Sequence, residues 1–270
     1  MSKNHIERLD NVKIVGTSHV SEESVESVKK NITEGNFDVV CVELDKERLY
    51  ALSNNIKQTE GLRSLALIRH VGITGFIFAM IASIAQKKIG KKLDMQPGSD
   101  MMAAAKTAGS MNIPVALIDQ DVKITLKNLS KNVKFREKMK IAFDLLKSLL
   151  GLRTPLNDID KGFDLKKVPP DELIEKILKK TKDRYSGLYK VLVDDRNKVM
   201  TKRILGIMKK NPEWNVLVVV GAGHKEGMIE KLEEFSGKRY EEHENKPDKK
   251  EGKNKQRHDI IYSDSHHTYE

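Results

Sequence analysis

The chain has 270 residues, a formal net charge of +10 and a single cysteine, Cys41. This length suits one large α/β domain, alone or with an appended subdomain. One cysteine excludes an intrachain disulfide and a cysteine-based zinc site, and it favours a reducing compartment. Residues 1–10 are polar and lack the apolar segment of a secretory signal, so the sequence predicts a cytoplasmic protein.

Strand and helix patterns alternate along the first half of the chain. Short apolar runs bounded by glycine or polar residues predict buried strands, and apolar residues three or four positions apart predict helices. The expected strands cover 12–15, 38–42 and 113–118, and the expected helices cover 22–34 and 97–110. Right-handed crossovers would make these strands parallel.

The second half begins with a long helical pattern, from 126 to 208, which prolines and glycines interrupt at 151–170. We expect this part, about 122–210, to form a helical cap or subdomain. A last apolar run at 216–220 then returns the chain to the sheet. The predicted fold class is α/β, with a mainly parallel central sheet flanked by helices over residues 1–235.

Two further segments stand apart in composition. Residues 65–89 are strongly apolar, but only 71–85 are free of charge, which is shorter than the roughly 20 residues of a membrane span. We therefore expect a core helix or a homodimer interface there, and membrane contact is the less favoured alternative. Residues 236–270 are polar except at 260–262, which predicts a disordered tail that adds little to stability.

Basic residues are concentrated at 123–153, which contains nine Lys or Arg and only two acids, Glu137 and Asp144. Such a stripe suits nucleic acid or anionic lipid. The favoured alternative is a solvated helix face, because aromatic residues for base stacking are nearly absent and no specific nucleic-acid partner is expected. Apolar residues would then lie behind the stripe: Ile124, Leu126, Leu129, Val133 and Phe135.

Two strands are followed by the same pattern, Gly-x-x-His. The first runs from Gly16 to His19 and the second from Gly221 to His224. Glycine lets the chain turn sharply as it leaves a strand, and ligands collect at the carboxyl ends of parallel strands. With Glu43, the two imidazoles could hold a divalent metal. The alternative is that each histidine has only a structural role in its loop.

Glu43 directly follows a buried run, where an unpaired carboxylate would be costly. Arg48, five residues later, could neutralise it, or Glu43 could be a metal ligand or the general base for a metal-bound water. We expect one of Asp119 and Asp121 at the same sheet edge. The Asp195-Arg196 pair could reach over that edge from the cap, and helix-surface ion pairs are the alternative for it.

Residues 1 to about 235 resemble the TraB/PrgY family in the order and spacing of several motifs. The motifs are Gly16-Thr17-Ser18-His19-Val20, Val42-Glu43-Leu44-Asp45 with Arg48, Pro97-Gly98-Ser99-Asp100-Met101, Ile118-Asp119-Gln120-Asp121 with Thr125-Leu126, Leu192-Val193-Asp194-Asp195-Arg196-Asn197 with Met200, and Val220-Gly221-Ala222-Gly223-His224. That family is similar to a wider group that includes the Tiki metalloproteases and the erythromycin esterases. The resemblance implies a site made of His19, Glu43 and His224, supported by Arg48 and Arg196.

Two functions are therefore expected. In the first, the protein is a metal-dependent, peptidase-like hydrolase of a peptide or similar amide or ester, with Mn, Co or Zn bound by His19 and His224. Glu43 would complete the site or act as base, and Arg48 or Arg196 would stabilise the oxyanion. In the second, a non-catalytic protein sequesters a peptide or partner through 65–85, as in pheromone shutdown. Dinucleotide binding is excluded, because neither glycine-rich loop has the Gly-x-Gly-x-x-Gly pattern.

Overall fold

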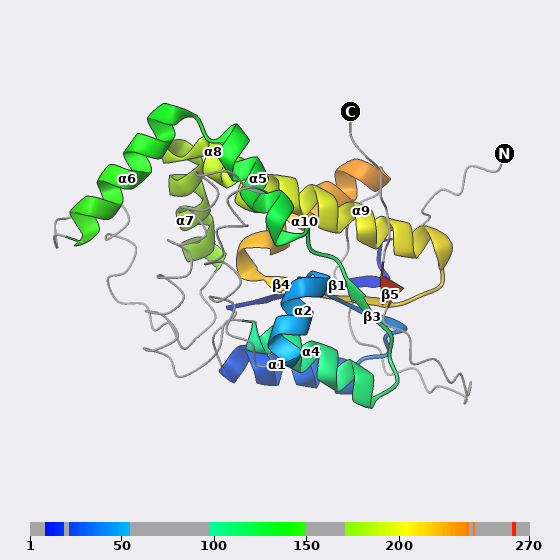
Figure 1. Cartoon of the computed structure of the whole chain (residues 1–270). Helices are drawn as coiled ribbons and strands as arrows, with labels where there is room; N and C mark the ends of the chain where they lie inside the picture. The colour runs from blue at the N-terminus through cyan, green and yellow to red at the C-terminus, as the bar shows by residue number, and fades with distance from the viewer. Residues whose placement is uncertain are drawn as a thin grey trace.

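The computed structural model describes residues 9–18, 22–54, 98–149, 171–237, 240 and 261–262. These residues form a parallel sheet with helices on both faces and a helical cap to one side, as Figure 1 shows. The predicted α/β class is confirmed. His19, the apolar segment at 65–89 and the interruption at 151–170 lie outside the described residues.

The sheet has the strand order β1-β4-β2-β3-β5, and all its pairings are parallel. Its strands are β1 (Val12–Thr17), β4 (Val216–Gly221), β2 (Val39–Val42), β3 (Val115–Leu117) and β5 (Ile261–Tyr262). Every residue of β4 is buried, as expected of a central parallel strand covered on both faces. Thr17 pairs with Gly221, and Val42 pairs with Val219 and Leu117, so these strands end at one edge.

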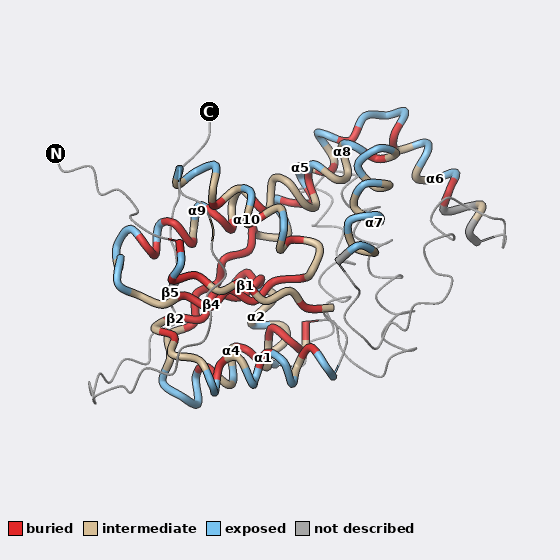
Figure 2. The backbone as a smooth tube through the Cα atoms, turned by 180° about the vertical axis from the view of Figure 1, so that it is seen from behind, coloured by how far each residue is buried: buried red, intermediate tan, exposed pale blue. Residues whose placement is uncertain are grey.

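Each face of the sheet is covered by a pair of helices (Figure 2). On one face lie α1 (Glu22–Glu34) and α4 (Ser99–Ser110), and on the other lie α9 (Asp195–Lys210) and α10 (Ala222–Ser236). The short α2 (Lys46–Ser53) follows β2 and packs near α4. On α4, Met101, Ala104 and Ala108 are buried at helical spacing, so one apolar side of this helix covers the sheet.

The cap is built from the predicted helical region. It contains α5 (Val122–Asn132), α6 (Phe135–Leu149), α7 (Asp171–Arg184), α8 (Ser186–Tyr189) and the π-helical turn η2 (Lys190–Asp194), which runs into α9. Leu126, Leu129 and Val133 are buried against Val191 in a small separate core. The expectation that Ile124 and Phe135 also lie behind the basic stripe is wrong, because they are 50% and 75% exposed.

Described residues of the tail contact the domain. Tyr240 packs against the core beside α9 and α10, and its backbone N–H donates to Glu233 Oε1 at 3.0 Å. Ile261–Tyr262 extend the sheet beside Ala116–Leu117. The rest of 238–270 lies outside the described residues. Within the described ranges, no helix is both long and apolar enough to cross a bilayer.

Candidate functional site

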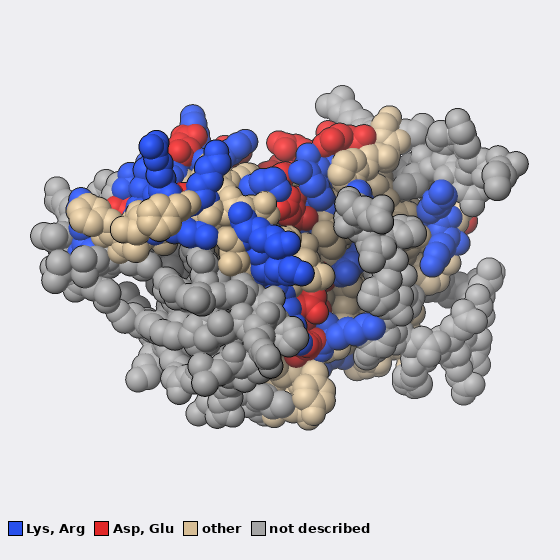
Figure 3. Space-filling view, turned by 45° about the horizontal axis from the view of Figure 1, so that its top comes forward, with Lys and Arg blue, Asp and Glu red and all other residues tan. Residues whose placement is uncertain are grey.

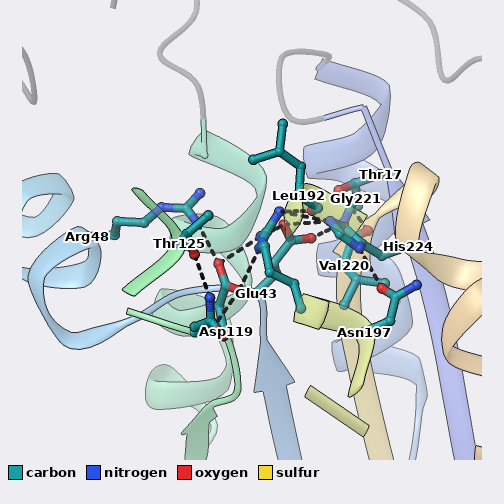
Figure 4. A network of polar contacts seen from close by, with 12 residues as sticks. Thr17, Glu43, Arg48, Asp119, Thr125, Leu192, Asn197, Val220, Gly221 and His224 are labelled. Atoms are coloured by element: carbon teal, nitrogen blue, oxygen red, sulfur yellow. Dashed lines mark hydrogen bonds and ion pairs between the residues drawn. The ribbon is translucent and has the colours of Figure 1, made fainter. Parts of the chain in front are cut away.

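The carboxyl edge of the sheet gathers charged side chains from four parts of the chain. Glu43 follows β2 directly, and Asp119 follows β3 after one intervening residue. His224 lies in the first turn of α10, and Arg196 lies in the first turn of α9. Figure 4 shows Glu43, Asp119 and His224 pointing toward one another above the strand ends. The structure thus brings Glu43 and His224 together at this edge, while His19, the third residue expected there, lies outside the described residues.

Arg196 lies at the centre of this cluster. Its guanidinium is bidentate on Asp119, with Nε 2.9 Å from Oδ1 and Nη2 2.8 Å from Oδ2, and Nη2 also forms an ion pair with Glu43 Oε1. The side chain is 15% exposed. Burial lowers the pKa of Arg196, but the carboxylates of Glu43 and Asp119 more than offset that effect and raise the pKa above its ordinary value. Arg196 is therefore a fixed cation of the site.

Glu43 is held on both carboxylate oxygens. Oε2 accepts the backbone N–H of Gly221 at 2.6 Å, and Oε1 faces Arg196 and lies 3.4 Å from His224 Nε2. The expected neutralising partner, Arg48, instead donates to Asp119 Oδ2 at 2.8 Å. The Asp119 N–H bonds to the Leu44 carbonyl at 3.2 Å, so Asp119 lies beside the turn that leads into α2. Arg48 consequently meets Asp119, and Arg196 reaches Glu43 from the cap.

The hydrogen bonds of His224 assign its tautomer. Nε2 lies 3.0 Å from Arg196 Nη1, and a guanidinium can only donate, so Nε2 accepts. Nδ1 then carries the proton and donates to Asn197 Oδ1 at 2.6 Å. The expectation that His224 projects from a loop is wrong: α10 begins at Ala222, directly after β4, and the imidazole is buried. The ring is thus held by hydrogen bonds on both nitrogens, and Nε2 lies 3.4 Å from Glu43 Oε1.

Asn197 is a site residue that the sequence reasoning missed. It is 3% exposed, and its amide orients His224. Gly227 makes room for it, since a Cβ at that position would overlap Asn197 Nδ2. The signal in the sequence was the spacing of His224 and Gly227, which places a small residue close to the histidine on one side of a helix.

A π-helical turn sets the position of Arg196. The N–H of Asp195 bonds to the carbonyl of Lys190, five residues earlier, where a regular α-helix would bond four residues earlier. The Leu192 carbonyl accepts from Arg196 Nη1 at 3.2 Å. Asp195 does not join the cluster and bonds Lys190 Nζ at 2.7 Å, so the helix-surface ion pair is the correct interpretation of its carboxylate.

The other predicted residues have supporting positions. Asp121 caps α5, accepting from Lys123 N at 2.7 Å, and Asp100 is buried in the first turn of α4, where Oδ1 accepts from Met101 N at 2.8 Å. A Cβ on Gly16 would lie 3.2 Å from the Cα of Ala222, so this glycine permits the close approach of β1 and α10.

Arg203 is a second residue that the sequence reasoning missed. Its Nη1 donates to the backbone carbonyl of Asp119. Burial lowers the pKa of Arg203, and Asp119 and Asp45 oppose that effect only in part. Arg203 therefore fixes the backbone of Asp119 from the side of α9, while Arg48 and Arg196 bind the carboxylate.

The described donors provide two ligands for a metal. Glu43 Oε1 and His224 Nε2 are 3.4 Å apart, which is close to the separation of two ligands about 2.1 Å from a tetrahedral ion. Arg196 contacts both of these atoms. Among the residues that the structure describes, no group of three or more His, Cys, Asp or Glu is arranged for a metal. A third ligand would have to come from elsewhere, as the expected role of His19 requires.

Comparisons with known proteins agree with the motifs. The chain is 35% identical over 222 residues to the uncharacterized protein MJ1365 of Methanocaldococcus jannaschii, covering 82% of this chain and 53% of that protein. It is 26% identical over 198 residues to the TraB domain-containing protein of Homo sapiens and 25% identical to that of Mus musculus, in each case over 70% of this chain and 50% of the relative.

The chain thus spans about half the length of the curated relatives that it matches. The sequence profile of the TraB/PrgY/gumN family matches residues 4–235, which span the domain from before β1 to the end of α10. On this match, which covers most of the sequence, the chain belongs to the TraB/PrgY/gumN family.

Proposed function

We propose that the protein is a hydrolase of a peptide or similar amide or ester, with its reaction centre at the cluster of Glu43, His224 and Arg196. One observation carries this proposal: the carboxylate of Glu43 and Nε2 of His224 lie 3.4 Å apart, and both contact the fixed cation Arg196. A carboxylate beside a guanidinium is suited to deprotonating a water and stabilising the resulting anion.

Each group has a distinct role in this proposal. Glu43 is the general base, oriented by the Gly221 N–H on one oxygen. Arg196 stabilises the developing oxyanion. Its positive charge acts strongly because water screens a buried charge less than an exposed one. The side chain of Arg48 is 28% exposed and that of Arg196 is 15% exposed. In this proposal a polar substrate therefore contacts Arg48 before it reaches Arg196.

A divalent metal is part of the same proposal. His19 and His224 would hold it, and Glu43 would either complete the ligand set or act only as the base. Mn, Co and Zn are all compatible with imidazole and carboxylate ligands. When bound, the ion lowers the pKa of a bound water toward about 7. The charges of the cluster sum to zero, with two carboxylates, Glu43 and Asp119, and two guanidinium groups, Arg48 and Arg196. Because Arg196 already contacts Glu43 Oε1, a metal that binds this oxygen competes with Arg196.

The alternative proposal is a non-catalytic protein that sequesters a peptide or partner. The charge balance of the cluster favours this alternative. Each carboxylate already has a cationic partner, so the ion pairs can have a purely structural role. The expected binding segment, 65–85, lies outside the described residues. Under either proposal the protein would act in a reducing compartment such as the cytoplasm, as its single buried cysteine suggests.

Metal content and hydrolysis of a peptide library, measured together, test these proposals. His19→Ala and His224→Ala should lose both, because each removes a proposed ligand. His258→Ala, in the polar tail, is the matched control and should lose neither. Circular dichroism must show that the variants remain folded, because His224 is buried.

One outcome would overturn the hydrolase, and another would overturn only its metal. Parent protein that binds peptide without cleaving it, with no change in His19→Ala or His224→Ala, would establish the sequestering protein. Cleavage that persists in metal-free parent protein would instead reject the metal and leave the hydrolytic cluster in place. The two parts of the proposal are thereby tested separately.

A further inference from the structure

The outer face of α6 is an exposed apolar stripe. Phe135, Met139 and Phe143 are spaced four residues apart, and their exposed fractions are 75%, 54% and 57%. At 3.6 residues per turn this spacing places them on one side of the helix. In Figure 1 α6 lies at the end of the cap that is farthest from the sheet. Exposed large apolar residues gathered in this way mark an interaction surface.

Both acids of the described part of α6 lie on its inner face. Glu137 accepts the N–H groups of Gly187 and Leu188 at 3.1 and 2.8 Å. Asp144 accepts from Arg184 Nε at 2.8 Å and from the hydroxyl of Tyr185. The two residues are 9% and 3% exposed, so their carboxylates bind groups within the cap and do not add negative charge to the outer face.

The outer face therefore carries basic charge beside the apolar stripe. Arg136 and Lys140 are exposed, and Lys147 Nζ lies 4.6 Å from the centre of the Phe143 ring. A helical projection at about 100° per residue places these three cations along one border of the stripe. Figure 3 shows the corresponding tan ridge bordered by blue Lys and Arg side chains. An apolar stripe with a cationic border is the arrangement of helices that lie in a membrane interface.

We propose that α6 docks this protein on the surface of an anionic lipid bilayer. Phe135, Met139 and Phe143 would enter the boundary between headgroups and acyl chains, while Arg136, Lys140 and Lys147 would meet lipid phosphates. The aliphatic stems of the basic residues would lie along the apolar stripe with their charges toward the headgroups. Docking of this kind is peripheral and reversible, and it requires no membrane-spanning helix.

The same observations disfavour other occupants. A nucleic acid would need cations at the centre of the surface, whereas here the centre is apolar and the cations form its border. A second copy would bury little: with about 200 Å² for each large side chain, the three residues expose roughly 400 Å². That area is about half of what one partner contributes to a standard interface.

Vesicle sedimentation with the full chain tests the proposal. The protein should sediment with vesicles that mix phosphatidylglycerol into phosphatidylcholine, about tenfold or more better than with phosphatidylcholine alone, and added salt should weaken that binding. The triple variant Phe135→Ser, Met139→Ser, Phe143→Ser should lose binding by about tenfold or more. Replacing Arg136, Lys140 and Lys147 with Gln should remove the preference for the anionic vesicles.

Matched controls use exposed residues elsewhere. Lys29→Gln with Lys30→Gln on α1 removes exposed cations, and Tyr50→Ser on α2 removes a side chain that is 65% exposed. None should change vesicle binding. As an independent measurement, a tryptophan placed by Phe135→Trp should shift its emission to the blue with anionic vesicles, and one placed by Tyr50→Trp should not.

Several results would overturn the membrane proposal. One is failure of the parent protein to bind anionic vesicles at low salt. Another is binding that survives the serine substitutions and disappears only in the glutamine variant, with DNA or RNA bound equally well, which would make the stripe a nucleic-acid surface. A dimer that the serine substitutions dissociate, without vesicle binding, would make it an interface between copies.

Discussion

At the scale of single residues, the arrangement around Arg196 explains which side chains the site requires. The guanidinium bonds two carboxylates, an imidazole and a backbone carbonyl, and most of this network is buried. A planar fork of donors is needed for such a pattern, so lysine is a poor substitute. Removing one member leaves buried charges without partners, which costs more than the net stabilisation of the intact network.

Arg196→Lys should lower the free energy of unfolding by about 2–3 kcal/mol, because lysine keeps the charge but cannot bond Asp119 at two points. Chemical denaturation provides the measurement. Arg48→Lys is the matched control: Arg48 donates one hydrogen bond to Asp119 from a more exposed position, and the substitution should cost less than about 1 kcal/mol. Equal losses in the two variants would contradict a central role for Arg196.

Gly227→Ala should destabilise the protein, although alanine normally favours a helix over glycine by about 0.5–1 kcal/mol. The added Cβ would displace the Asn197 amide that bonds His224 Nδ1, and we expect a net loss of about 1–2 kcal/mol. Gly206→Ala on α9 meets nothing within 4 Å and should be neutral or stabilising. Thermal unfolding of both variants compares them, and stabilisation by Gly227→Ala would show that Asn197 is not confined.

At the scale of elements, the hydrophobic pattern predicted most strands and helices. The expected helix at 97–110 corresponds to α4, and the apolar run at 216–220 corresponds to β4, because burial on one or both faces leaves a clear periodicity. The pattern could not predict the π-helical turn before Arg196, since apolar residues three or four positions apart do not locate a single hydrogen bond that spans five residues. Nor could it predict that α10 starts before His224, because glycine at Gly223 suggested a loop.

Asp144→Asn should loosen the docking of α6 on α7 and lower the free energy of unfolding by about 1–2 kcal/mol. Burial raises the pKa of Asp144, but hydrogen bonds from Tyr185 and Arg184 outweigh that effect, so the folded-state pKa lies below its usual value. The unfolded state thus binds the proton more tightly. The carboxylate contributes stability above about pH 4, and this contribution disappears as the pH falls through the folded-state pKa.

Denaturation from pH 7 to pH 3 measures this effect in the parent and in Asp144→Asn. The difference in stability between them should be largest at neutral pH and should shrink at the acidic end. Asp183→Asn, at an exposed position on α7, serves as the control. A difference that stays constant with pH would mean that the Asp144 charge does not hold the two helices together.

At the scale of the whole molecule, parallel crossovers account for why distant motifs meet. The sequence predicted that Glu43, Asp119 and His224 follow strands of one sheet, and that like ends of these strands lie together. It could not predict the strand order, in which β4 lies between β1 and β2, because neighbours in a parallel sheet need not be consecutive in sequence. That order brings Gly221 next to Glu43, so the backbone bond to the carboxylate depends on long-range pairing.

Ending the chain at Gly237 should lower stability by about 1–2 kcal/mol, in contrast to the small effect expected from tail composition. The shortened chain loses Tyr240, which packs on the core, and the strand that covers β3. Thermal unfolding of chains that end at residues 237 and 262 gives the comparison. Identical midpoints would show that Tyr240 and β5 contribute nothing in solution.

Turnover of a peptide library by the parent protein and by Glu43→Gln, with Mn, Co or Zn supplied, tests the central claim most directly. The account predicts cleavage by the parent and a decrease of about 10²-fold or more in Glu43→Gln, because glutamine cannot take the proton from water. Glu47→Gln, at an exposed position on α2, should cleave like the parent. Equal turnover by Glu43→Gln and the parent, or no cleavage by the folded parent with any of these metals, would contradict the account.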